Sequence, residues 1–130
     1  MAESLSCSQK TKMKMGNALK RLMKTTTFEK ITVSDITNEC NIHRQTFYYH
    51  FQDRYELLDW LLYNELIVPL VTDFNLDNMY EKLYGMFEQI ASDKKFYQNA
   101  LKLSSDDLTR YINRIANEQI AKLVKSLAIQ

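Results

Sequence analysis

The sequence predicts an all-α protein. Only two glycines and one proline occur in 130 residues, whereas β-hairpins usually depend on glycine in their turns. Apolar residues also recur at intervals of three and four along most of the chain, which is the spacing of a helix with one buried face. We therefore expect a succession of amphipathic helices.

The first predicted helix covers about residues 10–25 and follows a polar arm, residues 1–9, that has no apolar periodicity. Its apolar stripe consists of Met15, Ala18, Leu19, Leu22 and Met23. Its other face carries Lys10, Lys12, Lys14, Lys20, Arg21 and Lys24. A charged helix face is either a solvated surface or, beside a nucleic-acid-binding motif, a surface that approaches phosphate.

A short second helix is predicted to begin after Thr32. Thr32 suits the N-cap, and Asp35 three positions later completes a capping box and complements the helix dipole. The apolar face consists of Val33, Ile36 and Cys40. Asn41 is expected to end the helix, because asparagine tolerates a left-handed backbone better than most residues.

The third predicted helix starts at His43 and buries Phe47 and Phe51. The remaining side chains bear hydrogen-bonding groups and no carboxylate: Arg44, Gln45, Thr46, Tyr48, Tyr49 and His50. Arginine suits guanine, glutamine suits adenine, and threonine suits the thymine methyl group, whereas tyrosine and histidine suit phosphate oxygens. Two such helices joined by a tight turn indicate a helix-turn-helix with its recognition helix second. An ordinary solvated helix is the alternative.

A fourth helix is predicted from Asp53, which forms a second capping box with Glu56. Its core stripe consists of Leu57, Leu58, Leu61 and Leu62. Pro69 and the polar residues 72–77 are expected to end it. Beyond residue 78 we expect three further helices: one with Met79, Leu83, Met86, Phe87 and Ile90, a short one over 94–103, and a last one capped within 104–107.

The segment 32–58 resembles the DNA-binding part of the TetR family of bacterial transcriptional regulators. The matching pieces are ITVSDI, the core of TFYYHF and DRYELL. Within the family, the resemblance points to the branch that activates dihydroxyacetone kinase operons, which carries a similar RQTFYYHF and a similar FYQNALK. Two departures are Thr27 and Asn41, where many members have glycine. Thr27 is β-branched and disfavours positive φ, so we expect the first helix to end by a different turn.

The resemblance implies an N-terminal three-helix helix-turn-helix domain, joined by a long fourth helix to a truncated helical regulatory region. The expected parts are an arm (1–9), the DNA-binding domain (10–54), the connecting helix (55–72) and a partial regulatory or dimerisation region (78–130). The predicted base contacts are Arg44, Gln45 and Thr46. The predicted phosphate contacts are Thr32, His43, Tyr48, Tyr49, His50 and Arg54. The predicted ligand or partner face consists of Trp60, Tyr63, Tyr80, Tyr84 and Phe87, with packing in the core as the alternative role for the aromatic residues of the regulatory region.

The charge distribution agrees with this division. Residues 1–54 hold nine Lys or Arg against five Asp or Glu, and residues 55–130 hold eight against eleven. The opposite signs, +4 and −3, favour an N-terminal part that meets double-stranded DNA. Cys7 and Cys40 are expected to be reduced thiols, with redox sensing as the alternative. No signal peptide or membrane span is predicted, so we expect a cytoplasmic protein.

An enzyme is not predicted. The sequence lacks a glycine-rich phosphate loop and a nucleophile with a base beside it. His43 and His50 are seven residues apart and have no partner at zinc-binding spacing, so we expect neither a metal nor a cofactor.

The resemblance also predicts a homodimer, since paired recognition helices match operators whose half-sites lie about one DNA turn apart. Family members usually continue for two more helices that form the dimer, and this sequence stops before them, which would weaken dimerisation. Two functions stay open. The first is a sequence-specific DNA-binding regulator, and the second is a truncated interaction module that pairs with a full-length regulator or a sensor protein, with a protein co-regulator as a possible partner.

Overall fold

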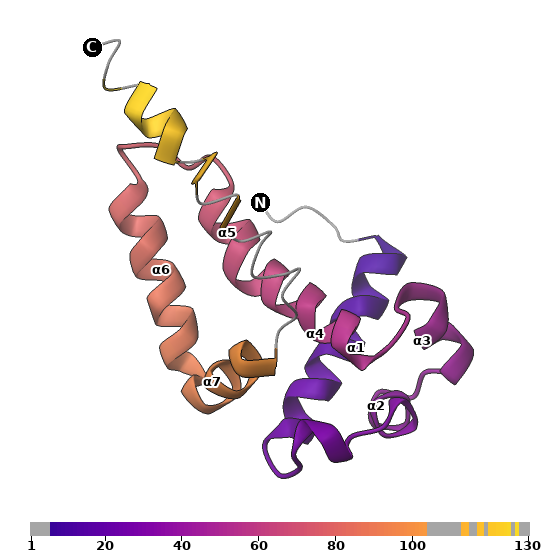
Figure 1. Ribbon diagram of the computed structural model, residues 1–130. Helices are drawn as coiled ribbons and strands as arrows, with labels where there is room; N and C mark the ends of the chain where they lie inside the picture. The colour runs from indigo at the N-terminus through magenta and orange to yellow at the C-terminus, as the bar shows by residue number, and fades with distance from the viewer. Residues whose placement is uncertain (1–5, 104–112, 115–116, 119, 126, 128–130) are drawn as a thin grey trace. The chain divides into compact units, whose positions relative to one another are not determined.

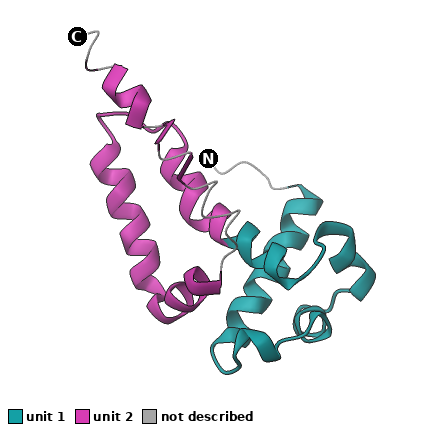
Figure 2. Cartoon of the chain, viewed as in Figure 1, with its two compact units in different colours: residues 1–61 teal, residues 62–130 magenta. Residues whose placement is uncertain are grey.

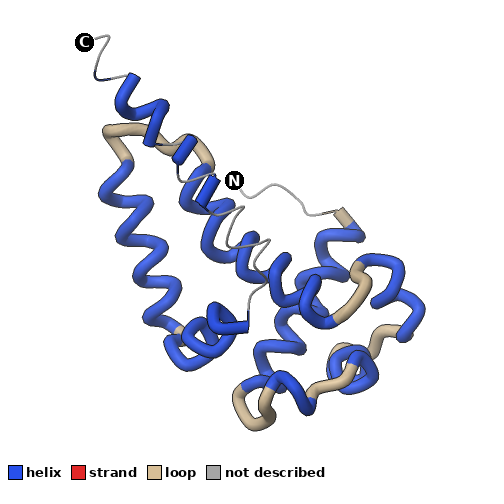
Figure 3. Tube along the Cα trace, viewed as in Figure 1, coloured by secondary structure: helices blue, strands red, loops and turns tan. Residues whose placement is uncertain are grey.

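The computed structural model describes residues 6–103 and, nearer the C-terminus, 113–114, 117–118, 120–125 and 127. Every regular element in this described part is helical, which confirms the all-α prediction (Figures 1 and 3). The chain divides into two compact units, residues 1–61 and 62–130 (Figure 2).

Helix α1 spans Cys7–Met23 and begins earlier than its apolar stripe indicates. The side chain of Ser6 accepts a hydrogen bond of 3.1 Å from the Gln9 N–H and caps the helix. The prediction that residues 6–9 belong to a polar arm is therefore wrong, because a serine cap can start a helix among residues that contribute nothing to a core. Residues 1–5 lie outside the described part.

The turn after α1 contains no left-handed residue. The helix closes with the Lys24 N–H bonded to the carbonyls of Arg21 and Leu22. Thr27 has φ −69° and precedes a short 3-10 turn, η1 (Phe28–Lys30). This confirms the expectation that a β-branched residue at position 27 excludes a turn based on positive φ.

Helix α2 (Val33–Glu39) begins with the predicted capping box. The Asp35 N–H donates to Thr32 Oγ1 at 3.0 Å, and the Thr32 N–H donates to Asp35 Oδ2 at 2.9 Å. Asn41 has φ 55°, as predicted for the residue that turns the chain. Helix α3 (Arg44–His50) follows with His43 at its N-cap, so the helix-turn-helix forms as expected.

Asn41 supplies a test of this turn. Replacing Asn41 with alanine should lower the free energy of unfolding by about 1–2 kcal/mol, because a left-handed backbone is strained for a residue with an ordinary side chain. Glycine at the same position should leave stability near that of the wild type, since it adopts positive φ without steric cost. Urea unfolding of the three proteins measures the difference, and equal loss in both variants would contradict the role of φ.

The core of the first unit consists of side chains from every one of its helices. The fully or almost fully buried members are Met15, Ala18, Leu19, Phe28, Ile31, Ile36, Phe47, Phe51, Leu57, Leu58 and Leu61. Gly16 lets α1 approach helix α4 (Arg54–Leu62) closely, because a Cβ atom at this position would lie 2.8 Å from Leu61 Cδ1. The Trp60 ring packs edge-on against Phe51, with 5.9 Å between the ring centroids.

Helix α4 (Arg54–Leu62) continues into the π-helical turn η2 (Tyr63–Ile67) and then into α5 (Val68–Val71). The helical run therefore passes through Pro69, contrary to the expectation that this residue helps to end it, and stops two residues later. The Val68 N–H bonds to the Tyr63 carbonyl, five residues back. Pro69 has no N–H to continue the regular ladder, so the widened turn accommodates the proline. The boundary between the two units lies at residues 61 and 62, inside α4.

The second unit contains α6 (Met79–Ser92), which packs against α5, and α7 (Lys94–Leu103). The bounds of α7 agree with the predicted 94–103. A pair of hydrogen bonds between Asn75 and Asn78 stabilises the turn before α6, with N–H to Oδ1 distances of 2.9 and 3.0 Å. The cap predicted within 104–107 lies outside the described residues, as does much of the last predicted helix.

Candidate nucleic-acid interface

Helix α3 presents a polar surface and buries one side chain. Phe47 has no exposed area, whereas Arg44 and Gln45 are exposed and Thr46 is half-buried. The first turn contains no acidic residue. Both observations agree with the sequence prediction that Phe47 holds the helix and that the neighbouring side chains point away from the core.

Two aromatic side chains extend this surface towards the end of α3. Tyr49 is 84% exposed and Tyr48 is 47% exposed. The Arg44 guanidinium carbon lies 5.7 Å from the centroid of the Tyr48 ring. A cation held over an aromatic ring is partly ordered before it meets a ligand, so Tyr48 can restrict the orientations of Arg44.

His50 lies at the C-terminal end of α3 and is half-buried. Burial and the positive charge of Lys12 lower the pKa of His50 below its usual value of 6.5. Lys12 comes from α1, and its Nζ atom lies 5.9 Å from the centroid of the Trp60 ring. Lys12 therefore lies near enough to His50 for its positive charge to oppose protonation of the imidazole. Sequence reasoning included Lys12 only as a member of a charged face.

Thr32 and His43 occupy the N-caps of α2 and α3, and both are exposed. The Thr32 hydroxyl accepts from the Asp35 N–H, and a hydroxyl that accepts one bond can still donate its own proton. The His43 side chain makes no capping hydrogen bond. These two side chains are therefore chemically suited to donate hydrogen bonds to acceptor oxygens.

Arg54 makes contacts that the sequence did not indicate. Its Nη1 atom donates to the carbonyl oxygens of Phe28 at 2.6 Å and Ile31 at 2.7 Å. The guanidinium carbon lies 4.7 Å from the centroid of the Phe28 ring. Arg54 thus connects the start of α4 to the segment immediately before α2.

Comparison with known proteins agrees with this geometry. Residues 17–61 match the family described as "Bacterial regulatory proteins, tetR family", and this range contains the C-terminal part of α1 (residues 17–23) and all of α2 and α3. The similarity to this family therefore covers residues 17–61. The chain is also 31% identical over 84 residues to the HTH-type dhaKLM operon transcriptional activator DhaS of Lactococcus lactis subsp. lactis (strain IL1403). The match covers 65% of this chain and 45% of that relative, so the chain spans about half the length of the relative.

Outside residues 17–61, three of the five predicted ligand or partner residues share one face of α6. Tyr80, Tyr84 and Phe87 are 78%, 55% and 61% exposed. The rings of Tyr80 and Tyr84 are stacked, with 6.3 Å between centroids. Trp60 belongs to the first unit, where it packs against Phe51, and Tyr63 is half-buried in η2. Tyr80, Tyr84 and Phe87 are therefore exposed together on α6, while Trp60 and Tyr63 belong to other elements.

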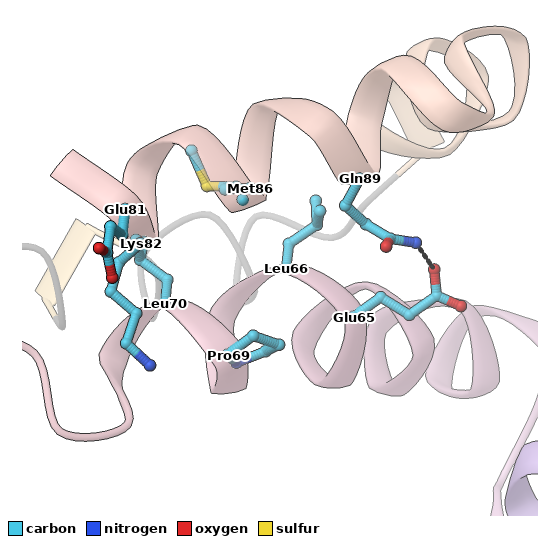
Figure 4. Close-up of a pocket in the computed structure, with 9 residues that line it drawn as sticks. Glu65, Leu66, Pro69, Leu70, Glu81, Lys82, Met86 and Gln89 are labelled. Atoms are coloured by element: carbon cyan, nitrogen blue, oxygen red, sulfur yellow. Dashed lines mark hydrogen bonds between the residues drawn. The ribbon is translucent and has the colours of Figure 1, made fainter. Parts of the chain in front are cut away.

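A pocket of about 260 Å³ lies between the η2–α5 run and α6 (Figure 4). Its lining residues are Glu65, Leu66, Pro69, Leu70, Glu81, Lys82, Gly85, Met86 and Gln89. None of the predicted aromatic residues is among them. Glu65, which interrupts an otherwise apolar run, was the available sequence signal for this pocket.

A hydrogen-bonded cluster borders the pocket. Gln89 Nε2 lies 2.9 Å from the Tyr97 hydroxyl and 3.5 Å from Glu65 Oε2, and the Tyr97 hydroxyl also donates to Glu65. Burial and the hydrogen bond to Glu65 raise the pKa of Tyr97 well above its usual value. Tyr97 therefore stays protonated and keeps donating to Glu65 at any pH near neutrality.

Metal-binding clusters and membrane spans are both absent from the described residues. Among these residues, no three or more His, Cys, Asp or Glu side chains gather in an arrangement that could hold a metal ion. None of the helices in this part of the chain is long and apolar enough to cross a membrane.

Proposed function

We propose that the chain is a sequence-specific DNA-binding transcriptional regulator of the cytoplasm, whose helix α3 enters the major groove. The observation that carries this proposal is the surface of α3. Phe47 is buried, and the outward side chains offer a guanidinium, an amide, hydroxyls and an imidazole without any carboxylate. An α-helix fits the major groove, where these groups match the hydrogen-bonding edges of bases.

Arg44, Gln45 and Thr46 are the proposed base contacts, because they lie in the first turn of α3. In helix-turn-helix proteins the N-terminal residues of the recognition helix contact base edges. An arginine suits guanine O6 and N7, and a glutamine suits adenine N6 and N7. The contact between Arg44 and the Tyr48 ring supports this role. Because the ring already restricts the guanidinium in the free chain, less conformational entropy is lost when Arg44 binds a base.

Thr32, His43, Tyr48, Tyr49 and His50 are the proposed phosphate contacts, and Lys12 joins them. Each offers a hydrogen-bond donor: Thr32 at the start of α2, Lys12 on α1, and the four others within α3 or at its N-cap. Phosphate contacts fix the position of a protein on DNA and carry little sequence information. We further propose that two copies of the chain bind together, because a helix-turn-helix dimer places two recognition helices about one DNA turn apart.

A mobility shift with the purified chain tests the proposed function. The chain should bind duplexes selected from a random pool, and the logarithm of the association constant should fall linearly with the logarithm of salt concentration between about 50 and 200 mM. The mass of the complex reports how many copies bind. Absence of a salt-sensitive complex, with the chain folded, would refute DNA binding by this chain alone.

DNA binding should strengthen as the pH falls through the titration of His50. In the free chain the pKa of His50 lies below its usual value of 6.5, and a phosphate beside the imidazolium would raise it in the complex. The complex then binds more protons than the free chain between the two pKa values, so affinity rises as pH falls through that interval. Below the pKa of the free chain the gain should level off.

Dissociation constants measured between pH of about 8 and 5 provide the test. The matched control is His50→Gln, which keeps a hydrogen-bonding side chain but cannot titrate, and His43 is present in both proteins. An identical pH profile for the two proteins would remove His50 from the phosphate contacts.

The alternative function is an interaction module that pairs with a full-length regulator or a sensor protein. The exposed aromatic face of α6, formed by Tyr80, Tyr84 and Phe87, favours it. Substituting all three with serine should leave DNA binding by the chain alone unchanged and abolish its association with such a partner. A chain that fails to shift any duplex at low salt, yet changes the DNA affinity of a co-expressed full-length relative, would support the alternative over the main proposal.

A further inference from the structure

The side chain of Arg54 connects two segments that are distant in the sequence. It projects from the first residue of α4, and its two acceptors, the Phe28 and Ile31 carbonyls, lie 26 and 23 residues earlier. Both bonds come from the single atom Nη1 and are short, at 2.6 and 2.7 Å. A charged donor makes a stronger hydrogen bond than a neutral one, so this contact holds the η1 turn firmly against α4.

Aromatic rings hold the same guanidinium. Its central carbon lies 4.7 Å from the Phe28 ring centroid and 5.7 Å from the Tyr55 ring centroid. The Phe28 and Tyr55 rings contact each other edge-on, with centroids 5.0 Å apart. Phe28 and Ile31 are only 2% and 1% exposed, so their carbonyls belong to a segment with little access to water, where a missing partner is costly.

The carbonyl that Arg54 holds at Ile31 belongs to the residue directly before Thr32. Thr32 is the N-cap of α2, and its hydroxyl and N–H exchange hydrogen bonds with Asp35. The position of the Thr32 hydroxyl therefore depends on the segment that Arg54 fixes. A phosphate contact by Thr32 requires that hydroxyl at one place relative to α3.

We propose that Arg54 is a positioning residue for DNA binding. It holds the Phe28 and Ile31 carbonyls, places Thr32 for its phosphate contact, and does not itself contact phosphate. This inference rests on the proposed function, and it assigns Arg54 a different role from the phosphate contact that the family resemblance implies.

Amide hydrogen exchange of the free chain tests the first half of this inference without DNA. In Arg54→Gln, exchange of the Thr32 and Asp35 amides should accelerate by about tenfold or more, as expected when hydrogen bonds to a charged group are removed. The Leu19 amide in the core of α1 serves as the internal reference for global unfolding. Arg21→Gln is the charge-matched control, because Arg21 pairs with Glu39 instead; it should leave the Thr32 and Asp35 amides unchanged.

Affinity for a random-sequence duplex, measured between about 50 and 200 mM salt, tests the second half. Arg54→Gln should weaken binding about tenfold at every salt concentration, with little change in the salt slope, because Arg54 itself does not touch phosphate. In a Thr32→Ala background the same substitution should cost less than about twofold, since residues that act through each other are not additive. If Arg54→Gln does not fold, Arg54→Lys replaces it in these measurements. The lysine variant keeps the positive charge and has an ammonium group with three hydrogen-bond donors.

Three results would overturn the inference. The first is a salt slope that falls by about 0.9 in Arg54→Gln, as expected when one phosphate contact is removed. The second is equal loss of affinity in the wild-type and Thr32→Ala backgrounds. The third is faster amide exchange with unchanged affinity, which would make the role of Arg54 structural only. Failure of the wild-type chain to bind DNA at all would instead refute the proposed function, so the two failures are distinguishable.

Discussion

Replacing Phe47 with alanine is expected to lower the free energy of unfolding of the first unit by about 3–5 kcal/mol, the usual cost of removing a buried phenylalanine. Phe47 has no exposed area, and its ring contacts the Tyr48 and Phe51 rings, with centroids 5.4 and 5.8 Å away. It is the only buried residue of α3. A loss of this size is a large fraction of the stability of a small domain, so a substantial part of the population should be unfolded.

Circular dichroism during urea titration measures this loss. Phe47→Leu is the matched core control and should cost less, because leucine refills much of the space that alanine leaves empty. Tyr49→Ala is the surface control, since Tyr49 is 84% exposed, and it should change stability by less than about 0.5 kcal/mol. Comparable destabilisation by Phe47→Ala and Tyr49→Ala would show that α3 is not held to the core through Phe47.

Replacing Arg44 with alanine is expected to reduce discrimination between the selected duplex and random DNA by about 1–3 kcal/mol, the range for one bidentate base contact. Arg44 is exposed in the first turn of α3, and its guanidinium is near the Tyr48 ring. Removing the hydrogen bonds to one base should relax sequence preference at that base pair only. Random DNA should lose much less affinity, because its binding depends on phosphate contacts.

Selection from a random pool, followed by affinity measurement on the selected and random duplexes, provides the readout. Arg21→Ala is the control, because it removes the same charge from the C-terminal part of α1, where Arg21 pairs with Glu39. It should leave the selected sequence unchanged. Equal losses of affinity on selected and random duplexes in Arg44→Ala would assign Arg44 to phosphate rather than to a base.

The helix-turn-helix was predictable because local rules determine it. The Thr32 and Asp35 capping box, the positive φ of Asn41 and the helix start after His43 each depend on residues within a few positions of one another. The same holds for the burial of Phe47 and Phe51, which follows from helical spacing. Sequence periodicity reports such short-range features directly.

The features that the sequence did not predict are of two kinds. Some are long-range contacts, and others depend on competing local rules. The Arg54 bonds to the carbonyls of Phe28 and Ile31 join separate segments of the chain, as do those in the cluster of Glu65, Gln89 and Tyr97. No periodicity encodes such pairs. Pro69 favours the end of a helix, but a π-helical turn accommodates it. The phosphate role of Arg54 rests on family likeness alone, which supplies no information on how this chain uses the side chain.

The separation of buried and outward-facing residues along α3 has a consequence for how such a regulator evolves. Of its seven residues only Phe47 is buried, so substitutions at the outward positions leave the hydrophobic core intact. On the proposed mode of recognition, a lineage can therefore exchange one target sequence for another by mutations that are nearly neutral for folding. Divergence of regulatory networks would then be limited by selection on gene expression, and only weakly by the thermal tolerance of the protein.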